Sequence, residues 1–173
     1  MITELNSDER IICIDESILC YDSISVKVWA KKGSKPIRMI TGQHKKTFIF
    51  GAVTNKREQL FRQFKSMTHA EFLTFLYCLK YKFGKFILLL DKAPWHRDGK
   101  VQNYLYKNRE SIHTIYFPPC SPELNPVEEC WKQSKPEIAG NQIYDDFSSL
   151  KSAVTRYFKT HRFGLDINHY LCP

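Results

Sequence analysis

The sequence LLLDKAPWH, residues 88–96, contains the clearest indication of the fold. It continues an apolar run that begins at Ile87, a few residues after a glycine at position 84, and the run ends at Leu90. Uninterrupted apolar runs of this length are typical of strands buried on both faces of a parallel sheet. Asp91 is therefore predicted to lie at the carboxyl end of a buried strand.

The residues that follow predict a crossover connection to a second parallel strand. Apolar residues recur at helical spacing over Lys100–Lys107, and Ile112–Tyr116 has the pattern of a short strand. A strand, a helix and a strand in this order usually form a right-handed parallel unit. Sites in open α/β sheets form outside the carboxyl ends of the strands. We therefore expect Asp91 and the chain after Tyr116 to converge in one crevice.

The segment FPPCSPELNPVEECW, residues 117–131, predicts a turn that leads into a helix. Asn125 is a favourable N-cap and Pro126 a favourable first helical residue, which places Glu128 in the first turn. Pro136 is expected to break this helix. Glu128 has two interpretations: it can line the crevice, or it can reach back to the Asn125 amide in a variant capping box worth about 1 kcal/mol. One residue can serve in both ways.

A second acidic residue lies in an apolar run near the amino terminus. Arg10–Ser17 has the pattern of a central strand and contains Asp15 and Glu16. An ionised carboxylate buried without a partner costs several kcal/mol, so Asp15 would need a cation, hydrogen bonds or a metal. Two alternatives stay open, since Asp15 can end the strand in solvent and Glu16 can be the inward residue.

The remaining pattern predicts a mixed α/β sheet in a single domain. Ser23–Ala30 and Lys46–Thr54 are predicted strands that would form an antiparallel meander with the first one. A capping box at Thr68 predicts a helix over Thr68–Phe83, and Asp146 can cap a last helix that extends to about Phe158. No run is long and apolar enough to span a bilayer.

The two quoted motifs, together with ICIDES at residues 12–17, closely resemble the catalytic domain of mariner-superfamily DDE transposases, in the branch found in prokaryotic insertion sequences. The resemblance covers roughly Ile11 to Phe158. It implies a ribonuclease-H-like fold with a mixed five-stranded sheet, in which three antiparallel strands precede the parallel ones and helices flank both faces. It also implies that Asp15, Asp91 and Glu128 are the catalytic, metal-binding acids.

The same resemblance implies a reaction, its cofactors and its auxiliary residues. Family members cut DNA at element ends and join the 3′ hydroxyl to target DNA, using Mg2+ or Mn2+, with two ions expected. His96 matches a histidine of the family motif, and Asn125 is a further auxiliary candidate. The family usually has asparagine where this chain has Lys92, which can either hold a phosphate or weaken metal binding.

Positive charge is concentrated in one part of the chain. The net charge is +8, and the region from Lys27 to Arg57 contains no acid. Such a run is either a solvated face or the footprint of a polyanion, and we favour nucleic acid. The residues assigned to DNA binding are Lys27, Lys31, Lys32, Lys35, Arg38, Lys45 and Lys46.

The expected partner is double-stranded DNA, both element ends and target, with no membrane involvement. Only fourteen residues precede Asp15, so the helix-turn-helix reader of the family is expected to be absent and residues 1–173 to form one catalytic domain. A homodimer and a separate N-terminal DNA-reading polypeptide stay open. The cysteine pattern favours reduced thiols, and the expected location is the cytoplasm, in association with the nucleoid.

Two other functions are compatible with these residues. A ribonuclease-H-like nuclease would share the acids and would not join strands. An inactive remnant of a transposase would bind DNA or regulate a full-length enzyme.

Overall fold

The computed structural model describes residues 9–22, 29–35, 42–140 and 142–171. Its strands are β1 (Ile11–Cys20), β2 (Lys46–Thr54), β3 (Gln59–Phe64), β4 (Phe86–Leu90) and β5 (Ile112–Tyr116). Its α-helices are α1 (His69–Phe83), α2 (Gly99–Lys107), α3 (Val127–Ala139), α4 (Phe147–Thr160) and α5 (Asn168–Leu171). The short 3-10 helices are η1 (Pro94–Arg97) and η2 (Pro122–Leu124).

The described strands form one five-stranded sheet in the order β3-β2-β1-β4-β5. The strand β1 pairs antiparallel with β2 and parallel with β4, while β2 pairs antiparallel with β3 and β4 pairs parallel with β5. The predicted mixed sheet, with three antiparallel strands before the parallel ones, is therefore confirmed. β1 is the central strand, and its first four residues, Ile11 to Ile14, are all buried, whereas Ile18 and Cys20 near its other end are exposed.

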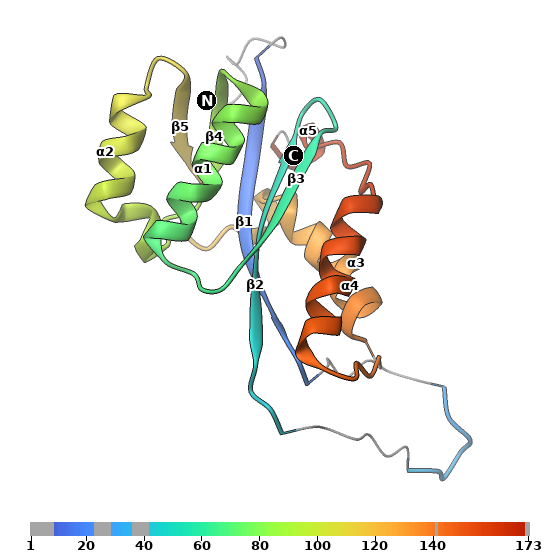
Figure 1. Ribbon diagram of the computed structural model, residues 1–173. Coiled ribbons are helices and arrows are strands. Elements are labelled where there is room, and N and C mark those ends of the chain that lie inside the picture. Colours follow the sequence, from blue (N-terminus) through green and yellow to red (C-terminus); the bar gives the residue numbers. More distant parts are fainter. Residues whose placement is uncertain (1–8, 23–28, 36–41, 141, 172–173) are drawn as a thin grey trace.

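Helices cover the two faces of the sheet as separate pairs (Figure 1). The helices α1 and α2 lie on one face, where Phe72, Phe75 and Leu88 belong to one buried hydrophobic cluster. The helices α3 and α4 lie on the other face, where Trp131 and Val154 belong to a second cluster. Alternate residues of β1 enter the two clusters, as the period of two along a strand requires. This alternation decides which face each acid of β1 reaches.

The antiparallel part of the sheet differs from the prediction in its third member. That strand is β3, which directly follows β2 and was not predicted. The predicted strand Ser23–Ala30 falls mostly outside the described residues, and its last two residues, Trp29 and Ala30, are not in a strand. The sequence QLFRQF of β3 mixes polar and apolar residues on both faces, which hides the alternation expected of a half-buried strand.

The helix α3 differs from the prediction at both ends. Pro136 does not break it, because the helix continues to Ala139. Pro136 and Lys132, whose carbonyl loses the usual amide partner, are both exposed, while Ile138 and Ala139 are buried and hold the last turn in the core. At the start, the assigned cap is Pro126, although Asn125 Oδ1 accepts a hydrogen bond from the Val127 amide at 3.2 Å.

Candidate active site

Asp15, Asp91 and Glu128 line one pocket of about 370 Å³. The parallel register pairs Cys13 with Leu89, and its continuation by two residues brings Asp15 level with Asp91 on neighbouring strands. Asp91 directly follows the last residue of β4, as predicted. Glu128 is in the first turn of α3, which packs against β1. Three separate segments thus supply one acid each to a common crevice.

Asp15 is held inside the sheet rather than at its end. The strand β1 continues to Cys20, so the alternative in which Asp15 ends the strand is wrong. The indole Nε1 of Trp131 donates a hydrogen bond to Asp15 Oδ2 at 2.6 Å. Burial raises the pKa of Asp15 to about 7, and the charges of Glu16 and Glu128 act in the same direction, while the Trp131 bond opposes them. The carboxyl group is therefore poised between its neutral and charged forms near neutral pH.

His96 does not line the pocket, but it connects one of the pocket's acids, Asp91, to Glu16. Its Nδ1 lies 2.8 Å from Asp91 Oδ1 and its Nε2 lies 3.0 Å from Glu16 Oε1. Burial disfavours the charged imidazole, but the hydrogen bonds to Asp91 and Glu16 outweigh this effect and raise the pKa of His96 to about 9. The bond from His96 in turn lowers the pKa of Asp91. Asp91 is therefore ionised and held in one orientation by a buried cation.

The other two predicted auxiliary residues, Lys92 and Asn125, do line the pocket. The side-chain amide of Asn125 donates to the carbonyl of Ile14 at 3.1 Å, which ties the start of α3 to the strand that carries Asp15. Lys92 is exposed, and its Nζ lies 6.0 Å from the centre of the Tyr116 ring. The capping-box contact of Glu128 is absent, because the Asn125 amide donates to Pro122 O instead. Glu128 is thus left facing the pocket.

The basic segment lies apart from this pocket. Lys31, Lys32 and Lys35 are exposed and belong to residues 29–35, which extend away from the rest of the molecule (Figure 1). Lys45 and Lys46 are exposed at the start of β2. None of these five residues lines the acid pocket. Lys27 and Arg38 lie outside the described residues.

Two residues with a role in the site were missed by sequence reasoning. Trp131 is not among the predicted site residues, yet it binds Asp15 while it also contacts Phe61 and Phe158 edge-on. Glu16 was named only as an alternative to Asp15, whereas both side chains turn inward, on opposite faces of the sheet. The alternation of a strand buried on both faces was the available signal. Gly51, opposite Asp15, makes room for the indole, since a Cβ there would lie 2.8 Å from the Trp131 ring.

The donor set of the pocket fits a hard divalent cation. Asp15, Asp91 and Glu128 offer only carboxylate oxygens, which Mg2+ and Mn2+ prefer over sulfur ligands. Within the described part of the chain, no group of three or more His, Cys, Asp or Glu side chains is already gathered tightly enough to hold an ion. Like charges repel at short range, so carboxylates without a cation are expected to stay apart.

The sheet order and the helices on both faces are those of a ribonuclease-H-like fold. Residues 10–151 match the model of the DDE superfamily endonuclease family, and the chain therefore belongs to this family. The predicted fold class is confirmed by solved structures of the same fold. The catalytic domain of Mos1 mariner transposase is 18% identical, with a TM-score of 0.64, over 93% of this chain and 76% of that chain.

Larger structures of Mos1 transposase give similar agreement. The paired-end complex with the left transposon end is 19% identical over 98% of this chain, with a TM-score of 0.73, and the match covers 54% of that chain. The mariner Mos1 paired-end complex with Mg is 19% identical over 93% of this chain and 52% of that chain, with a TM-score of 0.72. At these identities the likeness establishes the fold.

A curated bacterial relative matches a shorter region. The uncharacterized protein y4pE/y4sA of Sinorhizobium fredii is 36% identical over 64 residues, which is 37% of this chain and 44% of the relative. The matches therefore span about half of the Mos1 chain in the paired-end complexes and less than half of the curated relative. Separately, none of the helices in the described ranges is long and apolar enough to cross a membrane.

Proposed function

We propose that this chain is the catalytic domain of a DNA transposase from the insertion-sequence branch of the mariner superfamily. The observation that carries the proposal is the convergence of Asp15, Asp91 and Glu128, from three separate segments, on one pocket of a DDE superfamily endonuclease domain. The likeness in fold to Mos1 transposase supports the same assignment. The substrate is double-stranded DNA at the element ends, and then target DNA.

The proposed reaction consists of two in-line phosphoryl transfers. In the first, water attacks a phosphorus at the element end, a P–O bond forms, and the bond to the 3′ oxygen breaks and leaves a free 3′ hydroxyl. In the second, this hydroxyl attacks a phosphorus of the target strand and displaces the target's own 3′ oxygen. The protein forms no covalent intermediate in either step.

Asp15, Asp91 and Glu128 would hold the divalent ions, Mg2+ or Mn2+ and two in number. Bound there, the ions would supply activation of the attacking oxygen and stabilisation of the leaving oxygen. One mariner Mos1 paired-end complex was solved with Mg and another with Mn, which supports this choice of metal. The buried His96 would keep Asp91 ionised and fixed in orientation for this task.

Lys92 would contact a DNA phosphate at the mouth of the pocket. Its side chain is exposed and points over the Tyr116 ring, and no carboxylate lies within ion-pair distance of it among the described residues. An ammonium group at this position can bind a phosphate oxygen as a point charge. The asparagine that is usual in the family carries no charge, so Lys92 would hold DNA more strongly at this point.

The test is an assay of cleavage and joining with Mg2+ or Mn2+, DNA that carries the element ends, and a target duplex. Asp91→Asn and Glu128→Gln should each abolish both products while DNA retention at low salt stays similar. Glu129→Gln is the matched control, because Glu129 is next to Glu128 and contacts Gln133 and Lys132 outside the pocket. This control should keep wild-type activity.

Two other outcomes would replace the proposal. Cleavage that depends on the acids but yields no joined product would identify a nuclease of the ribonuclease-H-like kind. A wild-type protein that retains DNA and forms neither product, even with a DNA-reading polypeptide of the same element added, would identify a DNA-binding remnant.

A further inference from the structure

A second and larger pocket lies along the edge strand β3, away from the three acids. Its volume is about 720 Å³, and it shares no residue with the acid-lined pocket. Its walls come from β3, the carboxyl end of α1, and the last turns of α4 with the chain that follows. The lining includes Arg57, Arg62, Lys82, Lys159 and Arg162.

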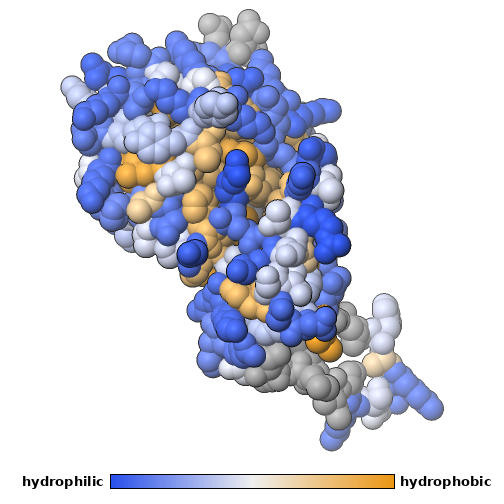
Figure 2. Space-filling view, viewed as in Figure 1, coloured by the Kyte–Doolittle hydropathy of each residue, from blue (hydrophilic) through white to orange (hydrophobic). Residues whose placement is uncertain are grey.

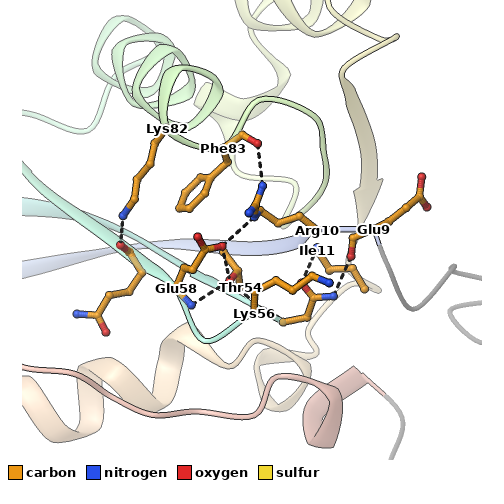
Figure 3. A network of polar contacts seen from close by, with 10 residues as sticks. Glu9, Arg10, Ile11, Thr54, Lys56, Glu58, Lys82 and Phe83 are labelled. Carbon is orange, nitrogen blue, oxygen red and sulfur yellow. Dashed lines mark hydrogen bonds and ion pairs between the residues drawn. The ribbon is translucent and has the colours of Figure 1, made fainter.

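These five cations are exposed and form no close ion pair. No carboxylate lies within ion-pair distance of any of them among the described residues. Glu58 is the acid that lines the pocket, and its Oε2 is 2.8 Å from Arg10 Nε (Figure 3). Glu58 also acts electrostatically on Lys82, but five cations against this one acid leave the lining of the pocket with a net positive charge.

The free edge of β3 in this groove is blocked by a lysine. The amide of Thr54 donates to Glu58 O, so alternation turns the backbone groups of Gln59 away from β2 and toward the free edge. Lys82 Nζ already occupies Gln59 O at 2.7 Å, and Figure 3 shows this lysine reaching across from α1. A lysine on a sheet edge blocks the pairing of another strand. An added peptide strand would have to displace it.

The floor of the groove is apolar. One of its neutral polar side chains, Gln63, is already hydrogen-bonded within the protein. Phe61, Val154 and Phe158 line the floor, and Figure 2 shows hydrophobic side chains in a band between two more hydrophilic lobes of this face. Gln63 Nε2 spans from β3 to the Lys151 carbonyl of α4 at 2.7 Å, which fixes the distance between the two walls. The groove thus combines exposed cations with apolar side chains, and one hydrogen bond links β3 to α4 across it.

We propose that this groove binds the phosphodiester backbone of a DNA segment other than the one at the acids. The exposed Lys and Arg side chains around this groove come from the β2–β3 turn, β3, α1, the end of α4 and the residues after it. Such side chains bind phosphates by charge and need no sequence readout. The inference rests on the proposed function only in taking DNA as the polyanion. A protein with two such surfaces holds two DNA segments at once.

The test uses the triple variant Arg62→Gln, Lys159→Gln and Arg162→Gln. All three side chains are exposed, so the variant is expected to fold. The matched control, Lys100→Gln with Lys107→Gln and Arg109→Gln, removes the same charge from exposed positions on or beside α2. Binding of a short duplex of arbitrary sequence is measured in EDTA, where no cleavage occurs, over a range of salt concentrations.

The groove variant should bind DNA at least roughly tenfold more weakly at low salt, and its salt slope should fall by about 2 to 3, which is about 0.9 for each phosphate that the protein no longer neutralises. The control should change both quantities much less. Equal effects of the two variants would overturn the proposal, because net charge alone would then explain them. A polyglutamate peptide that competes for the groove where duplex DNA does not would overturn it in favour of an acidic protein.

This outcome is separable from that of the proposed function. If the wild-type protein never cuts DNA but the groove variant loses salt-dependent binding, DNA binding by the groove is supported and the proposed catalysis is not. A protein that cuts and joins normally, with an unchanged salt slope in the groove variant, refutes the groove alone.

Discussion

The indole of Trp131 on α3 donates a hydrogen bond of 2.6 Å to Asp15 in the middle of β1. This contact joins a residue of the second hydrophobic cluster to a buried acid of the candidate site. It couples the packing of α3, including the edge contact of Trp131 with Phe61, to the position of one proposed metal ligand. A substitution of Trp131 is therefore expected to affect Asp15, and a substitution of Asp15 is expected to affect the packing of α3.

Replacement of Trp131 by phenylalanine is predicted to keep most of the packing and to remove the donor. A hydrogen bond to a charged group contributes roughly 1.5 to 3 kcal/mol, so the free energy of unfolding at pH 8 should fall by about that amount. The matched control is Trp95→Phe, because Trp95 Nε1 is buried without a partner in the described structure. Denaturant unfolding of both variants checks this, and equal losses would contradict it.

The raised pKa of Asp15 predicts that stability without metal falls as pH rises. Its pKa is 3.8 in the unfolded chain and about 7 in the folded one, so the folded state binds more protons between these values. The free energy of unfolding should thus decline from about pH 4 to pH 7 and then level off. Asp15→Asn should be more stable than wild type at pH 8 by on the order of a few kcal/mol, and by less at pH 5.

Denaturant unfolding in EDTA at the two pH values measures this difference. Asp145→Asn, at an exposed position, is the control and should show no such dependence. A constant stability difference between wild type and Asp15→Asn at both pH values would argue against a buried acid with a raised pKa.

The bridge from Glu16 through His96 to Asp91 predicts a second pH window. The folded pKa of His96, about 9, exceeds the unfolded value of 6.5, so its contribution to stability is present below about pH 6.5 and is lost as pH rises through 9. Glu16→Gln removes one of the two negative partners. The His96 titration, followed by NMR of the ring protons, should move down by roughly one unit or more.

Glu110→Gln, which changes an exposed acid beside Arg109, should leave that titration unchanged. An unaltered His96 titration in Glu16→Gln would mean that Asp91 alone holds the imidazole charged. The same variant is expected to weaken Mg2+ binding, because Asp91 is then held less firmly.

The exposed lysines of residues 29–35 are predicted to contact DNA without reading its sequence. Replacing Lys31, Lys32 and Lys35 with glutamine should lower the affinity for all duplexes and reduce the salt slope by about 0.9 for each lysine that had neutralised a phosphate. Affinity measured over a range of salt with two unrelated duplexes checks both features. A sequence-dependent loss, or an unchanged slope, would exclude this surface.

Much of the fold followed from local patterns. The apolar run before Asp91, the helical spacing over Lys100–Lys107 and the strand Ile112–Tyr116 predicted the parallel unit, because buried strands and amphipathic helices are each defined by their own period. The strand β3 was missed, because its polar residues are used in contacts with α4, such as the bonds from Gln63, rather than in solvent. The pattern of polar and apolar residues does not show that these polar side chains bind another element.

The sequence by itself determined that acids stand at positions 15, 91 and 128, one at a strand end, one at a helix start and one within an apolar run. Only the tertiary structure decided that they share a pocket, because the register of β1 against β4 is set by pairing between residues far apart in the chain. It also decided that Trp131 and Glu16 serve these acids and that five cations from separate segments line one groove. Which residues share a pocket depends on how the sheet and helices pack together. The local periodicity of the sequence does not determine this packing.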